Sequence, residues 1–512
     1  MTLTECDVPT ERTADLETTV AIIGSGFSGL GMAAQLRRRG RDDFAILEKA
    51  HDIGGTWRDN TYPGCGCDVP TALYSYSFEQ NPYWSKMWCS QPEIQEYLQR
   101  FTDKYDLRRK VLFDTRLVEA HWDAETSRWR GRLADGRTVS AQFVVISVAP
   151  LHLPKVPEHP GIESFTGPRF HSARWDHSVD LTGKRVAVIG TGASAIQFVP
   201  VIAEQAAELQ LYQRSPAWVL NRPNPTIPKL VQRLFARIPL TSSIFRAINY
   251  GVLELIGLGI YRDNTLNKLL RRGGVASIRR HIKDPVLAAK LTPDYRVGCK
   301  RLLFSSTYYR ALARPNADVI TDDIAEVRPN SIVTADGTER EVDVIIYATG
   351  FHVLNDRFDE LEIRGADGEM MADRWNAEGL QAHMGVSMAG MPNAFLLMGP
   401  NTGVAYSSIV FMIERQIEYV LRALDRVHER GATSIHVRRD AQDSFNEEIS
   451  RRSATRTWMT GGCTNWFTDA TGANRALWPG SSWGYRQASR KFDDSAFEFA
   501  GADSLRTAGM WT

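Results

Sequence analysis

The sequence has little of what marks a disulfide-stabilised or nucleic-acid-binding protein. Six cysteines in 512 residues are too few for a disulfide framework, so we expect six free thiols in a reducing cytoplasm. Lys and Arg number 61 and Asp and Glu 60, and the net charge of +1 gives no reason to expect a nucleic-acid partner. The first 17 residues lack the basic start and the apolar stretch of a signal peptide. These absences together predict a cytoplasmic protein.

Long hydrophobic runs are also scarce. The most apolar window, residues 244–261, is interrupted by Arg246, Asn249 and Glu254. It is too short and too broken to span a bilayer comfortably. We therefore expect a buried or interfacial helix and no membrane span. The remaining composition, 43 % hydrophobic and 24 % charged, is typical of a globular protein with a large core.

One pattern occurs twice in the chain. Residues 20–29 read VAIIGSGFSG and residues 186–195 read VAVIGTGASA, and an apolar helical stretch follows each. A buried strand, a glycine turn and a helix form the start of a dinucleotide-binding βαβ unit. The repeat predicts an α/β fold with two Rossmann-like dinucleotide-binding domains. Within the second of these domains, residues 222–298 have helical periodicity and no glycine fingerprint, which predicts a helical insertion.

The first fingerprint has the three glycines in their expected places. Gly24 makes the tight turn, Gly26 lets the backbone approach a pyrophosphate, and Gly29 lets the helix pack on the strand. Glu48 ends the next strand, where an acid hydrogen-bonds ribose hydroxyls and repels a 2′-phosphate. The alternative is a plain turn with an exposed glutamate. We predict FAD or NAD at this module.

The second fingerprint is followed by a residue of opposite charge at the end of the next strand. It consists of Gly190, Gly192 and Ala195, and its following strand ends at Arg214 instead of an acid. A cation at this position suits the 2′-phosphate of NADP, although a surface charge is the alternative. The opposite charges of Glu48 and Arg214 assign FAD to the first module and NADPH to the second.

Three further segments carry a resemblance to a known family. Residues 165–176 match the pattern FxGxxxHxxxW[P/D], residues 54–68 match GGxW…YPG…D, and residues 298–301 resemble GxKR. In these segments, and over the chain from about 20 to 490, the sequence resembles the type I Baeyer–Villiger monooxygenases, a branch of the class B flavin-dependent monooxygenases.

The resemblance implies a reaction. Such enzymes oxidise ketones to esters or lactones with NADPH and O₂, through a flavin C4a-peroxide. A class B relative that oxygenates nitrogen or sulfur is the alternative, and the Trp175-Asp176 ending argues against it. A flavin reductase or oxidase and a non-catalytic redox sensor are further alternatives. The identity of the ketone and the oligomeric state stay open.

The resemblance also implies site residues. Arg301 corresponds to the cation that holds the peroxide anion, and an arginine keeps its charge there. Asp68 corresponds to the acid that positions this arginine, with a turn cap as the alternative. Lys300 corresponds to a residue that contacts the NADP phosphate, with a solvated lysine as the alternative.

Aromatic residues complete the expected site. Trp57 and Tyr62 are expected to line the flavin pocket. Trp466 corresponds to a residue near the nicotinamide nucleotide, and packing in the core is an equal alternative. His171, in the centre of the family pattern, is expected to be a hydrogen-bonded structural residue rather than a proton-transfer group. The substrate pocket is expected near residues 404–408 and 459–467, and no metal site is expected.

These expectations divide the chain into five parts. The division is an FAD-binding domain in two pieces, an NADP-binding domain in two pieces and the insertion: 1–150 (FAD, first part), 151–221 (NADP, first part), 222–298 (helical insertion), 299–351 (NADP, second part), and 352–512 (FAD, second part, with a C-terminal loop).

Overall fold

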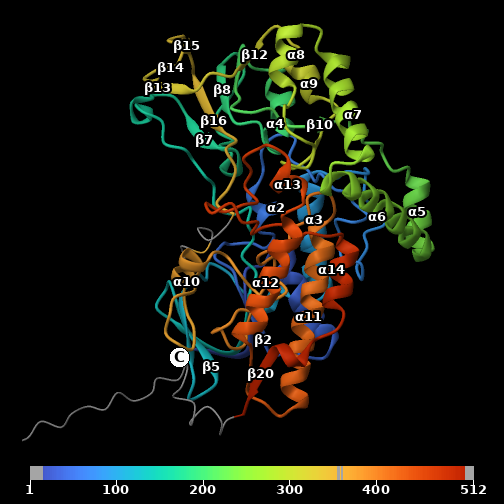
Figure 1. Ribbon diagram of the computed structural model, residues 1–512, viewed down its shortest axis with the longest axis vertical. Coiled ribbons are helices and arrows are strands. Elements are labelled where there is room, and N and C mark those ends of the chain that lie inside the picture. Colours follow the sequence, from blue (N-terminus) through green and yellow to red (C-terminus); the bar gives the residue numbers. More distant parts are fainter. Residues whose placement is uncertain (1–14, 354–357, 359–360, 502–512) are drawn as a thin grey trace, which may run out of the picture.

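The computed structural model describes residues 15–353, 358 and 361–501. The amino-terminal stretch 1–14, with Cys6, lies outside the described residues. Two sheet-containing lobes lie one above the other along the long axis, and helices α5 and α6 lie at one side, as Figure 1 shows. The predicted fold, two Rossmann-like α/β units with a helical insertion, is confirmed.

The lower lobe contains the first fingerprint. Its largest sheet has the strand order β17-β4-β5-β6-β1-β2-β3, with β18 paired to β6. In the centre, β1 pairs in parallel with both β2 and β6, so that Val20 lies opposite Phe44 on one side and Phe143 on the other. The strands are β1 Leu16–Ile23, β2 Phe44–Leu47, β3 Val111–Leu112, β4 Leu117–Asp123, β5 Arg128–Leu133, β6 Thr138–Ile146, β17 Glu362–Arg364 and β18 Ala394–Leu396.

The upper lobe contains the second fingerprint. Its five-stranded sheet has the order β12-β9-β8-β16-β7, and every neighbouring pair in it is parallel. Parallel strands covered on both faces explain the continuous apolar runs seen in the sequence. The strands are β7 Arg169–His171, β8 Arg185–Ile189, β9 Glu208–Tyr212, β12 Ala317–Ile320 and β16 Val344–Tyr347.

The predicted helical insertion contains four helices, α5 Lys229–Arg237, α6 Pro239–Tyr261, α7 Thr265–His281 and α8 Pro285–Leu291. Helix α6 is the one described helix that is long and apolar enough to cross a membrane by length and composition. Its most apolar window is 33 % buried inside the protein, so the helix is partly a core element. The two lobes and the insertion share one buried cluster, because Val20, Val186 and Leu253 all belong to it.

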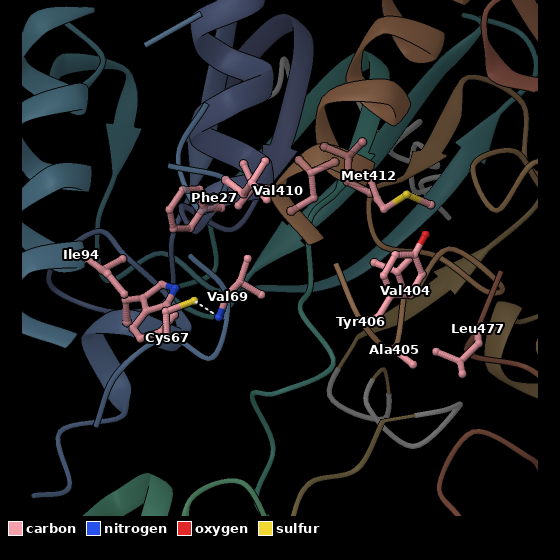
Figure 2. Close-up of a cluster of buried hydrophobic side chains, with 14 of the residues drawn as sticks. Phe27, Cys67, Val69, Ile94, Val404, Ala405, Tyr406, Val410, Met412 and Leu477 are labelled. Carbon is pink, nitrogen blue, oxygen red and sulfur yellow. Dashed lines mark hydrogen bonds between the residues drawn. The ribbon is translucent and has the colours of Figure 1, made fainter. Parts of the chain in front are cut away.

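The remaining helices and strands complete the two lobes. Helix α1 packs against α11, and residues near the start of each, Phe27 and Val410, lie in the buried cluster of Figure 2. These elements are α1 Phe27–Arg38, α2 Thr56–Asp59, α3 Gln91–Lys104, α4 Ala195–Ile202, β10 Val219–Leu220, β11 Leu303–Phe304, α9 Tyr308–Leu312, β13 Ile324–Arg328, β14 Ser331–Thr334, β15 Glu339–Glu341, α10 Met371–Glu378, α11 Ile409–Glu429, β19 Ser434–Val437, α12 Arg439–Ser453, α13 Thr457–Thr460, α14 Ser482–Ser489 and β20 Phe497–Ala500, with short 3₁₀ turns at Arg108–Lys110, Ile162–Ser164, Ser172–Arg174 and Asp494–Ala496.

The cysteines differ from the expectation of free thiols. Cys299 and Cys463 form a disulfide between residues 164 positions apart, so the prediction that all six are free is wrong. Cys65, Cys67 and Cys89 are free and buried. Burial raises the pKa of the Cys65 thiol to about 12, and these side chains therefore stay protonated and unreactive.

Candidate active site

The first fingerprint forms a tight turn in which two of the three glycines are required by the protein's own backbone. Gly24 has a φ of +99°, and a Cβ at Gly29 would lie 1.9 Å from the Gly24 carbonyl oxygen. Both positions therefore require glycine. Gly26 is different, because the nearest atoms to a Cβ there lie 4.0 Å away, in Gly54 and Gly55. A side chain at Gly26 would therefore not collide with the protein itself, so packing alone does not explain the glycine there.

Helix α1 starts at this turn with unpaired backbone donors. Among the described residues no side chain caps its amino terminus, and its first turn has no acidic residue. The first N–H groups of a helix have no partner inside the helix and attract anions. The tight turn and the uncapped start of helix α1 fit a pyrophosphate.

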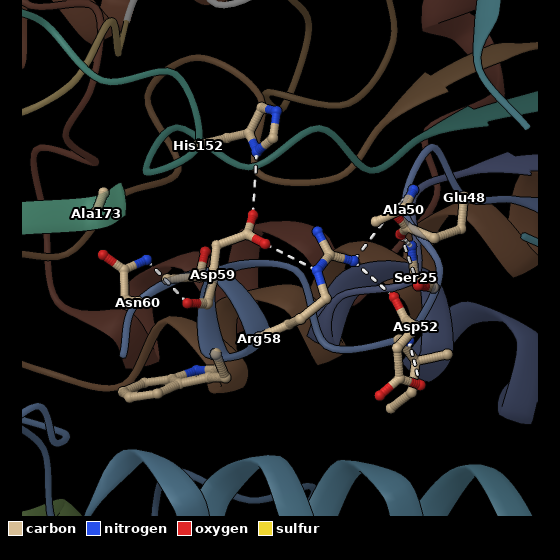
Figure 3. A network of polar contacts seen from close by, with 12 residues as sticks. Ser25, Glu48, Ala50, Asp52, Arg58, Asp59, Asn60, His152 and Ala173 are labelled. Carbon is tan, nitrogen blue, oxygen red and sulfur yellow. Dashed lines mark hydrogen bonds and ion pairs between the residues drawn. The ribbon is translucent and has the colours of Figure 1, made fainter. Parts of the chain in front are cut away.

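Glu48 lies at this turn in a buried network (Figure 3). Its Oε2 accepts hydrogen bonds from the Ser25 N–H at 2.9 Å and the Ser25 hydroxyl at 2.6 Å. Its Oε1 accepts from the Ala50 N–H at 2.9 Å and from Arg58 Nη1 at 3.1 Å. Glu48 is therefore not an exposed surface acid, and the alternative of an exposed glutamate is wrong.

Arg58, which joins several parts of this network, was not predicted from the sequence. Arg58 also donates through Nε to Asp59 Oδ1 at 2.8 Å and through Nη1 to the Asp52 carbonyl at 2.6 Å. His152 Nδ1 lies 3.7 Å from Asp59 Oδ2. Burial alone would raise the pKa of Asp59, but His152 and Arg58 lower it to about 2. Arg58 thus fixes helix α2 to the strand that carries Glu48.

The second fingerprint repeats the geometry of the first. Gly190 has a φ of +107°, and a Cβ there would lie 2.5 Å from the Ala348 carbonyl oxygen, just after β16. At Gly192 the nearest atom to a Cβ is 3.8 Å away, so a Cβ there would meet no clash, as at Gly26. Ala195 is fully buried and begins helix α4. This turn also fits a pyrophosphate.

Two cations lie together beside the second fingerprint. Lys300 Nζ donates a hydrogen bond to the Ser215 hydroxyl. Burial and the neighbouring Arg214 lower the pKa of Lys300 below its ordinary value. Arg214 itself is exposed. A pair of adjacent cations next to a hydroxyl is an arrangement that binds a phosphate group.

Arg301 and Asp68 meet between the two modules. Arg301 Nε and Nη2 donate to the same carboxylate oxygen, Asp68 Oδ2, at 2.9 and 2.7 Å. The Asp68 charge outweighs burial and raises the pKa of Arg301 above its ordinary value. Nη1 of Arg301 forms no hydrogen bond with any described residue, so its two N–H groups are available to a ligand. The pair lies 233 positions apart in the chain.

A second arginine near Asp68 was not predicted from the sequence. Arg222 Nη1 donates to the Cys67 carbonyl at 3.0 Å, and its guanidinium lies 5.1 Å from the centre of the Trp88 ring. Burial lowers the pKa of Arg222, and the charge of Asp68 opposes that effect. Arg222 holds the segment that carries Asp68 in place.

Trp57 and Tyr62 are both largely buried. Trp57 forms a hydrogen bond within its own module, and Tyr62 forms one with the other module. Trp57 Nε1 donates to the Tyr74 hydroxyl at 3.1 Å. The Tyr62 hydroxyl donates to Gln197 Oε1 at 2.9 Å, and Gln197 lies on α4 of the upper lobe. Tyr62 therefore joins the segment after the first fingerprint to the helix after the second.

His171 and Trp175 occupy structural positions. Burial lowers the pKa of His171 to about 4, and its Nδ1 accepts a hydrogen bond from the Ala173 N–H at 3.1 Å. The Trp175 ring lies 5.3 Å from that of Phe198, and Phe198 lies 6.0 Å from Tyr62. The expected hydrogen bond is found at Nδ1, whereas Nε2 is buried without a partner among the described residues. The aromatic chain from Trp175 to Tyr62 connects the two lobes.

The two segments expected near the substrate differ in exposure. Val404, Ala405 and Tyr406 are each about 5–6 % exposed, and Figure 2 shows them with Leu477 in a buried cluster. Trp466 is 43 % exposed, so the alternative that it packs in the core is wrong. It follows the disulfide-linked Cys463 by three positions.

Comparisons with known proteins agree on one family. A family model described as flavin-binding monooxygenase-like matches residues 17–226. A Baeyer–Villiger monooxygenase of Pseudomonas aeruginosa is 47 % identical over 479 residues, covering 93 % of this chain and 90 % of that protein. One of Streptomyces coelicolor is 44 % identical over 480 residues, covering 94 % and 92 %. The solved structure of OTEMO in complex with FAD and NADP aligns with a TM-score of 0.84 and 28 % identity, covering 96 % of this chain and all of the other.

Proposed function

Because the chain belongs to the Baeyer–Villiger monooxygenases, flavoenzymes that use FAD and NADPH, we propose that it converts small ketones to esters or lactones. One oxygen atom of O₂ enters the carbon–carbon bond next to the carbonyl, the other leaves as water, and NADPH supplies the two electrons. FAD, when bound and reduced, supplies the activated oxygen for this insertion.

The observation that carries the proposal is the geometry of Arg301. Asp68 binds two of its three nitrogens through a single oxygen, which fixes the orientation of the guanidinium. The third nitrogen stays available to stabilise negative charge on the reacting oxygen. A fixed cation in a partly buried site stabilises such charge more strongly than water does. In this proposal Arg301 is catalytic and Asp68 is a positioning residue.

We assign the first module to FAD. The backbone at Gly26, which carries no side chain, and the free donors of helix α1 receive the pyrophosphate, and Gly24 and Gly29 keep the turn tight. Glu48 binds the ribose. A ribose hydroxyl donates to a Glu48 carboxylate oxygen that already accepts a hydrogen bond from Ser25 or Arg58. This module comprises residues 1–150 and 352–512.

The flavin pocket and the second module complete the assignment. Trp57 and Tyr62 line the flavin pocket. Residues 151–221 and 299–351 form the NADPH module, in which Gly190, Gly192 and Ala195 carry the pyrophosphate turn. Trp466 approaches the nicotinamide, since its ring is exposed. We propose a cytoplasmic location.

Arg214 and Lys300 are the proposed 2′-phosphate site. Each cation on a phosphate oxygen is a charge-assisted contact of roughly 1.5–3 kcal/mol. Arg214→Ala is therefore expected to raise the KM for NADPH by about tenfold or more and to leave the KM for NADH nearly unchanged. Steady-state kinetics with both cofactors measure this. Equal losses with NADPH and NADH would contradict the assignment, and Arg233→Ala, another exposed arginine, is the matched control.

Product analysis tests the reaction itself. The FAD-loaded enzyme, NADPH and O₂ are incubated with a simple cyclic or linear ketone and, in parallel, with a thioether. We expect lactone or ester, detected by gas chromatography, in amounts that match the NADPH consumed. Sulfoxide as the main product, with no ester from any ketone of a panel, would assign the enzyme to nitrogen or sulfur oxygenation instead.

A further inference from the structure

Helix α6 exposes a stripe of large apolar side chains that covers its whole length. Six leucine, isoleucine and valine residues recur every three or four positions on one side and are each 51–67 % exposed: Leu240, Ile244, Ile248, Val252, Leu255 and Leu258. No charged residue of α6 is exposed. A helix on the surface of a globular protein normally shows polar residues on its outer side, so this stripe is unusual.

The neighbouring helices also expose large apolar side chains. Leu230 and Leu234 of α5 are 76 % and 43 % exposed, Ile238 between the helices is 49 % exposed, and Leu269 of α7 is 60 % exposed. We call these four residues and the six of α6 the apolar face. Figure 1 shows α5 and the adjoining part of α6 at the outer edge of the molecule, away from both large sheets. Exposed apolar patches of this extent mark an interaction surface.

The opposite side of α6 is attached to the rest of the protein by polar contacts. Arg246 Nη1 donates to the Ser75 carbonyl at 3.0 Å. Glu254 Oε1 accepts from the Tyr406 hydroxyl at 2.9 Å, and Tyr250 lies within hydrogen-bond distance of Ser482, at 3.0 Å. A helix with one side bound in this way cannot be surrounded by lipid. Only the apolar face can enter an apolar phase.

Cations are numerous on the helices next to α6. Between residues 229 and 283, ten exposed lysines and arginines lie on α5, on α7 and in the adjoining turns: Lys229, Arg233, Arg237, Arg262, Lys268, Arg271, Arg272, Arg279, Arg280 and Lys283. None of these ten forms an ion pair with a described acidic residue. The one exposed acid in this range, Asp263, pairs with Arg296 at 3.3 Å. The chain as a whole has a net charge of only +1, so positive charge is concentrated here.

We propose that the apolar face and these ten cations form a docking surface for a membrane that contains anionic lipids. The apolar side chains enter the boundary between headgroups and acyl chains, and the cations bind the lipid phosphates, while the protein stays on one side of the bilayer. Amphipathic helices with basic flanks bind membranes in this manner. The positive charge favours an anionic membrane over a second copy of the chain. A two-fold contact through this face would bring two sets of ten cations together, and they would repel each other.

Vesicle co-sedimentation of the FAD-loaded enzyme tests the proposal without any turnover. Two vesicle compositions are compared, phosphatidylcholine alone and phosphatidylcholine with about a third of phosphatidylglycerol. We expect binding to the anionic vesicles, weaker binding to the neutral ones, and a decrease on raising salt from about 0.1 M to about 0.5 M. Each removed cation is expected to weaken binding by about fivefold, which Arg271→Ala and Arg272→Ala measure.

A charged substitution in the apolar face tests whether its side chains enter the bilayer or whether the cations alone attract the anionic lipids. Ile248→Asp is expected to reduce vesicle binding by about tenfold or more, with an unchanged flavin spectrum and melting temperature, because Ile248 is 60 % exposed. The control is Val156→Asp, which alters another exposed apolar residue outside the face, 51 % exposed. This control is expected to bind vesicles like the parent enzyme.

Two results would overturn the proposal. One is the absence of binding to anionic vesicles at low salt, or binding that Ile248→Asp leaves intact. The other is a dimer in light-scattering measurements that Ile248→Asp converts to a monomer while neither form binds vesicles. The second result would assign the face to a second copy of the chain.

Discussion

Arg301→Ala is expected to lower ester formation by about a hundredfold to a thousandfold, which is the effect of losing one preorganised contact to a developing oxyanion. FAD binding and reduction by NADPH are expected to remain, because the fingerprint glycines do not contact Arg301. NADPH is then consumed without product, and hydrogen peroxide accumulates in place of ester. The measurement is ester formed per NADPH oxidised, with hydrogen peroxide determined separately.

Two further variants show whether the guanidinium geometry matters. Arg301→Lys is expected to restore little activity, since a lysine cannot bind Asp68 through two nitrogens and present a third to a ligand. Asp68→Ala is expected to cause a smaller loss, because it removes only the group that orients the arginine. Arg296→Ala, a change in an exposed arginine of the same segment, is the control and should be neutral. An Arg301→Ala enzyme with the parent ester yield would show that Arg301 is structural.

Gly29→Ala is expected to destabilise the first module by about 3 kcal/mol or more, because overpacking at a site that cannot shift is costly. The added Cβ would lie 1.9 Å from the Gly24 carbonyl oxygen, and that oxygen belongs to the fixed fingerprint turn. Urea unfolding of the FAD-free protein measures the loss. A protein of unchanged stability would mean that helix α1 packs on its strand differently from the arrangement described here.

Gly26→Ala is the matched variant at the same turn. Its Cβ has no protein atom closer than 4.0 Å, so the FAD-free protein is expected to keep its stability. The methyl group enters the space assigned to the pyrophosphate, and the Kd for FAD is therefore expected to rise about tenfold or more, the effect of losing roughly one charge-assisted contact. Unchanged FAD affinity would show that the cofactor does not approach the backbone here.

The features predicted well from the sequence are local ones. The fingerprints at Gly24 and Gly190 could be recognised because a buried strand, a turn and a helix follow one another within a few residues. The helical insertion was also predictable, because its periodicity is a property of one segment. In both cases the residues that carry the signal are the residues that form the structure.

The features that were missed depend on contacts between distant segments. Arg58 contacts Glu48 only because helix α2 folds back over the fingerprint turn, and no spacing rule predicts that contact. The disulfide joins residues 164 positions apart, so the count of six cysteines predicted the wrong state for two of them. The apolar sequence of α6 was compatible with a buried or an interfacial helix, and only tertiary packing decides which side is covered.

The disulfide also has a mechanical consequence. Cys299 precedes Arg301 by two residues, and Cys463 precedes Trp466 by three. The bond therefore ties the segment that carries Arg301 to the loop that carries Trp466. In the proposed function, Arg301 stabilises charge on the reacting oxygen and Trp466 approaches the nicotinamide. A displacement of that loop, such as one that admits or releases the nucleotide, would then also shift the arginine segment, because only a few bonds separate the two.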